Sequence, residues 1–142
     1  MLRFLSLTCL LVAVLFNTGC GTGGSKTFDV KGTVTFDGKP VPAGRIDFFP
    51  DLAKNNDGPQ GFAFIKNGEF DTRLGGQGHT GGPVIIRIEG FEGKSDDPRF
   101  LGNPIFVAHQ IHRDMPKEAT TEALEVPASA AVGLVIPTGP RS

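Results

Sequence analysis

The sequence predicts an all-β fold, an antiparallel β-sandwich of about seven strands, and three observations support this prediction. Short segments of alternating apolar and polar residues recur between residues 28 and 126, and turn signals separate them about every ten residues. Apolar residues nowhere repeat at helical spacing over three turns. Alternation with a period of two is the pattern of a half-buried strand, and short strands at this spacing are typical of sandwiches.

The clearest strand covers residues 28–36. Its alternate positions, which we expect on the core-facing side, are Phe28, Val30, Gly32, Val34 and Phe36. Asp37-Gly38 then marks a turn, and Pro40 and Pro42 keep the following connection extended.

Further strands are predicted along the rest of the chain. Residues 44–50 form a short strand, ended by Pro50, that is one candidate for an exposed edge. Residues 61–72 form a hairpin around Asn67-Gly68, the preferred pair for a type I′ turn. The remaining candidate strands are residues 83–91, 119–127 and 130–137, and residues 115–120 are a candidate for one helical turn.

Aromatic usage is one-sided, with 12 Phe, no Tyr and no Trp. Phe provides buried area without a hydrogen-bonding tip, so most of these side chains are expected in the core. The absence of Trp and Tyr also disfavours the stacking of sugar rings on the surface.

The N-terminus has the pattern of an export signal. Arg3 precedes an apolar run from Phe4 to Phe16, and these 13 residues are too few to span a bilayer but suit a secretory signal. Thr18-Gly19-Cys20 then resembles the lipobox of bacterial lipoprotein signals, although Asn17 stands where Leu is usual.

That resemblance implies that Cys20 is acylated and becomes the first residue of the mature chain. Residues 1–19 are then a lipoprotein signal peptide, residues 20–27 a flexible Gly-rich tether, and residues 28–142 the folded domain. Attachment through two or more acyl chains holds firmly to a membrane. Gly21 after the cysteine favours the outer membrane, so we expect a lipid-anchored protein of the cell envelope. The alternative is an ordinary secretory signal with an incidental cysteine.

Charge and cysteine content narrow the possible partners. The whole chain has 14 Lys and Arg against 15 Asp and Glu, and loss of Arg3 with the signal leaves 13 against 15, a net charge of −2. A nearly neutral chain without a basic cluster argues against nucleic acid as a partner. Cys9 lies in the signal, so Cys20 has no partner for a disulfide in the mature chain.

Residues 28–90 resemble the carboxypeptidase regulatory-like, transthyretin-like β-sandwich family, and the tail resembles it loosely. The positions that match its pattern are Gly32, Val34, Gly38, Pro40, Val41, Ala43, Asn67, Gly68 and Phe70. The chain is also similar to short bacterial lipoproteins that carry this single domain. The resemblance implies a fold and no chemistry, because these positions serve as turns and core.

No catalytic set emerges, and we expect neither an enzyme nor a cofactor. Hydroxyisourate hydrolases, which share the transthyretin-like fold, end in Tyr-Arg-Gly-Ser, whereas this chain ends in Thr-Gly-Pro-Arg-Ser and has no Tyr. The His-x-x-Glu pair of zinc carboxypeptidases and the Gly-x-Ser-x-Gly of serine hydrolases are both missing from the sequence.

The three histidines are the remaining candidates for chemistry. His109, His112 and Asp114 would share a metal ion if they lay on a helix, but i and i+3 point to opposite faces of a strand. Since Pro104 and Pro116 flank this segment, we expect exposed loop histidines instead. His79, in a glycine-rich loop, is also expected to be exposed.

The sequence therefore predicts a non-catalytic, lipid-anchored β-sandwich of the envelope that acts as an accessory or protein-interaction module. Strand addition at an exposed edge would bind a partner envelope protein. A first alternative is a small-ligand or carbohydrate binder, with residues 75–82 and 92–103 forming one rim around Arg87, Arg99 and His109. A second alternative is a metal-binding protein that uses His109, His112 and Asp114 as ligands.

Overall fold

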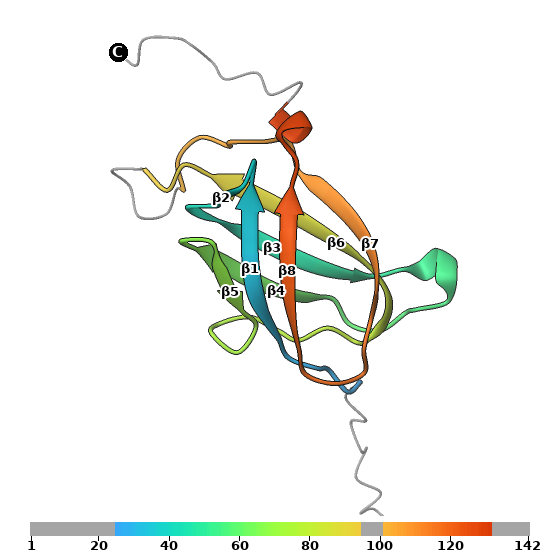
Figure 1. The fold of residues 1–142 in the computed structure, drawn as a ribbon. Coiled ribbons are helices and arrows are strands. Elements are labelled where there is room, and N and C mark those ends of the chain that lie inside the picture. Colours follow the sequence, from blue (N-terminus) through green and yellow to red (C-terminus); the bar gives the residue numbers. More distant parts are fainter. Residues whose placement is uncertain (1–24, 95–100, 132–142) are drawn as a thin grey trace, which may run out of the picture.

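The computed structural model describes residues 25–94 and 101–131 and confirms the all-β prediction (Figure 1). The strands are β1 (Val30–Phe36), β2 (Lys39–Pro40), β3 (Ala43–Pro50), β4 (Gly61–Lys66), β5 (Glu69–Asp71), β6 (Gly82–Phe91), β7 (His109–Met115) and β8 (Thr120–Val126). Two short 3₁₀ helices, η1 (Leu52–Lys54) and η2 (Ala128–Ala131), complete the described elements.

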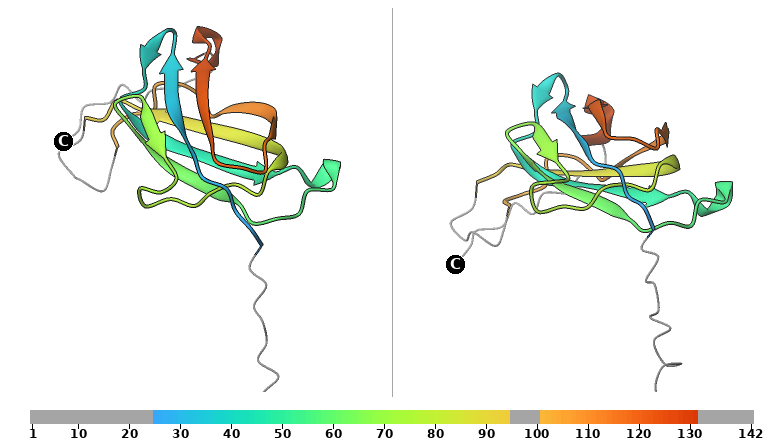
Figure 2. Two further views of the ribbon diagram at one scale, coloured as in Figure 1. Left: turned by 60° about the horizontal axis from the view of Figure 1, so that its bottom comes forward. Right: turned by 90° about the horizontal axis from the view of Figure 1, so that it is seen from below.

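The strands form one curled sheet whose two halves face each other. The order is β2-β1-β5-β4-β3-β6-β7, and β8 pairs with the other side of β1. In Figures 1 and 2, β1 and β8 cross over the layer formed by β3, β4 and β6, which gives a sandwich-like arrangement. β5 pairs with both β1 and β4 and so links the two halves.

One pair of strands departs from the antiparallel expectation. β8 runs parallel to β1 over its full length, from Val30↔Thr120 to Phe36↔Val126. The short turn after β7 delivers the chain to the end of the sheet at which β1 begins, so β8 can only run in the same direction as β1 (Figure 1).

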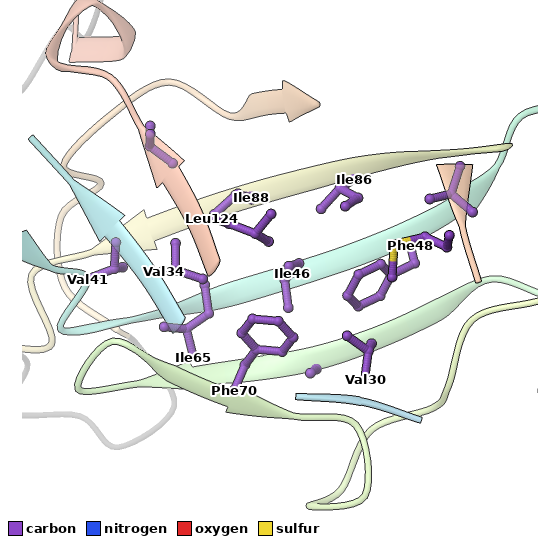
Figure 3. Close-up of a cluster of buried hydrophobic side chains, with 14 of the residues drawn as sticks. Val30, Val34, Val41, Ile46, Phe48, Ile65, Phe70, Ile86, Ile88 and Leu124 are labelled. Atoms are coloured by element: carbon purple, nitrogen blue, oxygen red, sulfur yellow. The ribbon is translucent and has the colours of Figure 1, made fainter. Parts of the chain in front are cut away.

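The core lies between the two halves of the sheet (Figure 3). Alternate residues of β1, β3, β4, β6 and β8 point into it, as the sequence pattern predicts for half-buried strands. Its buried apolar members are Val30, Val34, Val41, Ile46, Phe48, Ala63, Ile65, Phe70, Val84, Ile86, Ile88, Phe106, Met115, Leu124 and Val126.

The predicted hairpin turn is confirmed between β4 and β5. Asn67 and Gly68 have φ angles of 52° and 79°, and two positive φ values are what a type I′ turn requires. Asp37 and Gly38, with φ angles of 49° and 72°, make the same kind of turn between β1 and β2.

The prediction that residues 44–50 form an edge strand is wrong. β3 lies between β4 and β6, with Ile46 opposite both Ala63 and Ile88. Pro50 ends the strand without exposing it, because a proline at the last position removes no hydrogen bond from the middle of the ladder. Within the described ranges, β7 and β8 each pair with a neighbour on one side only.

Three other predictions of local structure differ from the structure or fall partly outside the described residues. Residues 109–115 form strand β7 instead of a loop, and residues 115–120 hold no helical turn, since β7 ends and β8 begins there. Of the candidate strand at 130–137, the first two residues belong to η2 and the rest lie outside the described residues.

Candidate functional site

Two adjoining hollows lie on the outer face of β1, β4, β5 and β8, and we call them together the outer groove. The larger hollow has a volume of about 630 Å³ and the smaller about 360 Å³. Lys31 and Thr121 line both hollows, so the groove is continuous across the sheet. The larger is lined by Lys31, Gly32, Thr33, Phe64, Lys66, Asn67, Glu69, Phe70, Asp71, Leu74 and Thr121, and the smaller by Asp29, Val30, Lys31, Arg73, Ala119, Thr120 and Thr121.

The shortness of β5 makes room for the groove. β5 ends after three residues, and the chain then turns, with the Leu74 amide donating to the Asp71 carbonyl at 3.0 Å. This turn holds Arg73 and Leu74 beside the sheet, where they form one wall. The side chains of Lys31 and Thr33 on β1 lie in register with Asp71 and Glu69 and share their face.

The larger hollow is lined in part by exposed apolar side chains. Phe64 is 51% exposed and Leu74 is 76% exposed. Phe62 lies edge-on to Phe64 with ring centroids 5.9 Å apart, and the Arg45 guanidinium lies 4.7 Å from the Phe62 centroid. Covering the part of these side chains that is still exposed contributes about 25 cal/mol per Å² of apolar area, so contact with this surface is favoured.

An ion pair lies where the two hollows adjoin. Arg73 donates from Nη2 to Asp71 Oδ2 at 2.6 Å and from Nε to Oδ1 at 3.0 Å. The Arg73 hydrogen bonds lower the pKa of Asp71 from 3.8 to about 2, and the same contact raises the pKa of Arg73. The pair therefore stays charged at neutral pH and forms a polar ridge in the groove, with Asp71 lining the larger hollow and Arg73 the smaller.

The three candidate metal ligands do not converge. His109 lies opposite Ile88 on the core-facing side of β7, whereas His112 and Asp114 lie opposite Ile85 and Pro83 on the outer side. Over residues 25–94 and 101–131, no three His, Cys, Asp or Glu side chains are grouped closely enough to hold a metal ion.

The candidate ligand set around Arg87 does not converge either. Arg87 is on the outer face of β6, where it pairs with Glu89, while His109 is on the opposite face. Arg99 lies outside the described residues. The two loops that were expected to form one rim flank β6 at opposite ends, and ten strand residues separate them by about 33 Å. The single-rim prediction is wrong.

His79 is the site residue that the sequence placed incorrectly. Its side chain is fully buried, not exposed, and its ring lies 6.1 Å from the rings of both Phe28 and Phe48. Burial lowers its pKa below 6.5, and the charge of Asp29 opposes this shift. Phe28 lies 51 positions before His79 in the sequence, so no local pattern around His79 predicts that its side chain is buried.

Comparisons with known proteins identify no relative: no family model, curated protein or solved structure gives a significant match to the chain. No helix of the described residues is long and apolar enough to cross a membrane. Cys20 and the signal that precedes it lie outside the described residues.

Proposed function

We propose that the protein is a non-catalytic binding module of the bacterial cell envelope, anchored at the outer membrane through lipid on Cys20. Its partner is another envelope protein, an extended segment of which lies in the outer groove. The observation that carries this proposal is the exposure of Phe64 and Leu74 beside a charged ridge in a continuous hollow. The resemblance to transthyretin-like domains supports a module without chemistry of its own.

The lining of the groove supports a protein partner. Apolar side chains at the centre with polar residues around them are the usual composition of protein interfaces, and aromatic residues contribute most of their binding energy. Lys66 and Glu69 carry opposite charges on the same wall of the larger hollow. A peptide with one large apolar side chain between polar groups would contact the apolar side chains, Lys66 and Glu69 together.

The neighbouring edge strand supports an extended occupant. Thr121 lines both hollows and belongs to β8, which pairs with β1 alone in the described structure. β8 contains no Pro and has Glu122 and Glu125 as its charged residues, whereas β7 carries His112, Arg113 and Asp114 in succession. A segment leaving the groove at Thr121 can therefore continue as a strand beside β8.

The length of the tether agrees with this role. Phe28 lies eight positions after Cys20, and a chain of that length reaches at most about 29 Å. Asp29 and Val30, which line the smaller hollow, follow directly. An anchor on Cys20 would hold that end of the groove near the membrane surface, where envelope proteins are concentrated.

A small-ligand binder is the second candidate, and the volume of the larger hollow favours it. About 630 Å³ lies within the range of small-molecule sites. The ligand would contact Phe64 and Leu74 instead of the residues first expected around β6. We do not extend the proposal to a metal, because the histidines of β7 lie on opposite faces.

Photo-crosslinking in intact cells tests the proposal, and the chain offers a matched control. A photo-crosslinking amino acid replaces Leu74 in one strain and Leu52 in another, because the two leucines are 76% and 74% exposed and only Leu74 lines the groove. We expect a discrete protein adduct from position 74, none from position 52, and loss of the adduct when Phe64→Ala is added.

The outcomes separate the candidates. Equal labelling from both positions, or an adduct that survives Phe64→Ala, would contradict a partner site in the groove. An adduct of small mass on position 74, without a protein attached, would support the small-ligand candidate instead.

A further inference from the structure

His79 combines burial with an unusual set of polar contacts. The side chain is 0% exposed. Nδ1 accepts a hydrogen bond from the Gly81 amide at 2.9 Å, while Nε2 is buried and has no partner among the described residues. Since an accepting nitrogen has no proton, the neutral ring carries its single proton on Nε2.

Protonation is incompatible with this arrangement. A second proton would have to occupy Nδ1, where it would face the Gly81 N–H instead of a lone pair. The charged ring would also lie between Phe28 and Phe48, which offer no hydrogen-bond acceptor in their side chains. The folded position of His79 therefore requires a neutral imidazole.

The backbone of His79 fastens the start of the domain. Its carbonyl accepts from the Phe28 amide at 2.7 Å, and its amide donates to the Phe28 carbonyl at 3.0 Å. The neighbouring Gly78 allows this approach, because a Cβ there would lie 2.4 Å from the Phe28 carbonyl oxygen. Residues 28 and 79 thus hold the N-terminal entry of the chain against the loop that precedes β6.

The same loop forms a wall of the outer groove. Thr72, at its beginning, accepts from the Val30 amide at 3.0 Å through Oγ1, and Arg73 and Leu74 follow. Between Thr72 and His79, Gln77 pairs with Phe62 of β4 through two backbone hydrogen bonds of 2.9 Å. The contact of His79 with Phe28 can therefore loosen while the wall that carries Leu74 stays paired with β4.

Few charges surround the ring. From the N-terminal segment, Asp29 favours the charged form and Lys26 lies 5.2 Å from the centre of the Phe28 ring. From the turn before β8, the Lys117 side chain packs against Gly81. Phe48 on β3 contributes no charge to this contact. Asp29 is the one group here that favours protonation, and burial outweighs it.

We propose that His79 is a pH-sensitive latch: when its imidazole takes up a second proton, residues 78–81 separate from Phe28 and release the N-terminal entry of the domain. The latch does not depend on the groove binding a partner. It makes mildly acid conditions a signal that changes the shape of the domain next to its tether.

The direction of the pH effect follows from the burial of His79. Because its folded pKa is lowered below 6.5, the contribution of the contact to stability is complete above about pH 6.5 and declines as pH falls below it. Each pH unit below that value weakens the contact up to about tenfold, until the folded pKa is reached.

Hydrogen exchange of the processed chain, purified from membranes in detergent, tests the latch. We expect the protection of the Phe28, His79 and Gly81 amides to fall, by up to about tenfold, between pH 7.5 and pH 5.5, after correction for intrinsic exchange. Amides in the centre of β3 and β6 keep their protection. His79→Asn retains an acceptor for Gly81 without titrating near neutrality, so its protection is expected not to change with pH, whereas His112→Asn, at an exposed histidine, behaves like the original protein.

Titration of the His79 ring by NMR on the unsubstituted protein completes the test and requires no variant. A His79 pKa of 6.5 or higher would overturn the proposal. So would protection that is constant with pH, equal loss of protection throughout β3 and β6, or a decline that persists in His79→Asn.

Discussion

Asp71 and Arg73 form the most sharply defined polar contact in the outer groove, although both lie at the surface. Three hydrogen bonds from the guanidinium, at 2.6 to 3.2 Å, and one from the Arg73 amide converge on one carboxylate. Such fork-like geometry is stronger than that of ordinary surface ion pairs because it fixes both groups. This polar ridge is therefore a charged feature that any occupant of the groove meets.

We predict that the Asp71 carboxyl titrates near pH 2, and that Arg73→Gln raises its pKa toward 3.8 because the hydrogen bonds to the carboxylate are lost. Since the folded pKa is depressed, the contribution of the pair to stability is present above about pH 3.8 and is lost as pH falls toward 2. NMR titration of the side-chain carboxyl carbons measures both values. Arg113→Gln on β7 is the control, and an equal shift of Asp71 in that variant would refute the assignment.

The residues of β4 illustrate why the burial of a single side chain is hard to predict from the sequence. Phe62 and Phe64 alternate with Ala63 and Ile65, so both faces of the strand are apolar and the pattern cannot say which face is buried. The structure buries Ala63 and Ile65 and leaves Phe64 at the surface, contrary to the expectation that phenylalanines are core residues. His79 was misplaced for a related reason, since its burial depends on a distant strand.

Among the elements, the strands themselves were predictable and their neighbours were not. Alternation and turn residues located β1, β3, the β4–β5 hairpin, β6 and β8, because these signals are local. Which strands lie at an edge depends on pairings between distant segments, so β3 was expected at an edge and lies in the centre. β7 was missed because its charged residues face solvent on both sides of an edge strand.

Gly32 allows β1 and β8 to pair as closely as they do. A Cβ at this position would lie 1.8 Å from the Glu122 carbonyl oxygen, and that oxygen cannot move without disturbing the ladder. We predict that Gly32→Ala lowers the free energy of unfolding by about 3 kcal/mol, measured by urea denaturation.

The matched control for this prediction is Thr33→Ala on the exposed face of the same strand, which is expected to cost less than about 1 kcal/mol. Equal effects of the two substitutions would mean that the β1–β8 pairing is looser than the structure indicates.

At the scale of the whole molecule, three features lie at one end of the domain. The chain enters at Phe28, the smaller hollow begins at Asp29, and the buried His79 holds both to the loop that carries Leu74. If Cys20 carries lipid, Phe28 lies within about 29 Å of a membrane along the tether. The proposed latch would then lie at the point where the tether enters the domain.

The anchor is the claim on which this arrangement depends, and intact mass is its most direct test. The protein is expressed with its own signal in a bacterial host, beside a Cys20→Ala control. We predict a mature chain that starts at Cys20 and carries the added mass of diacylglycerol and an acyl group, with no such species from the control. An unmodified chain cleaved at another position would contradict the account, because the domain would then be a free secreted protein and the small-ligand binder would become the better proposal.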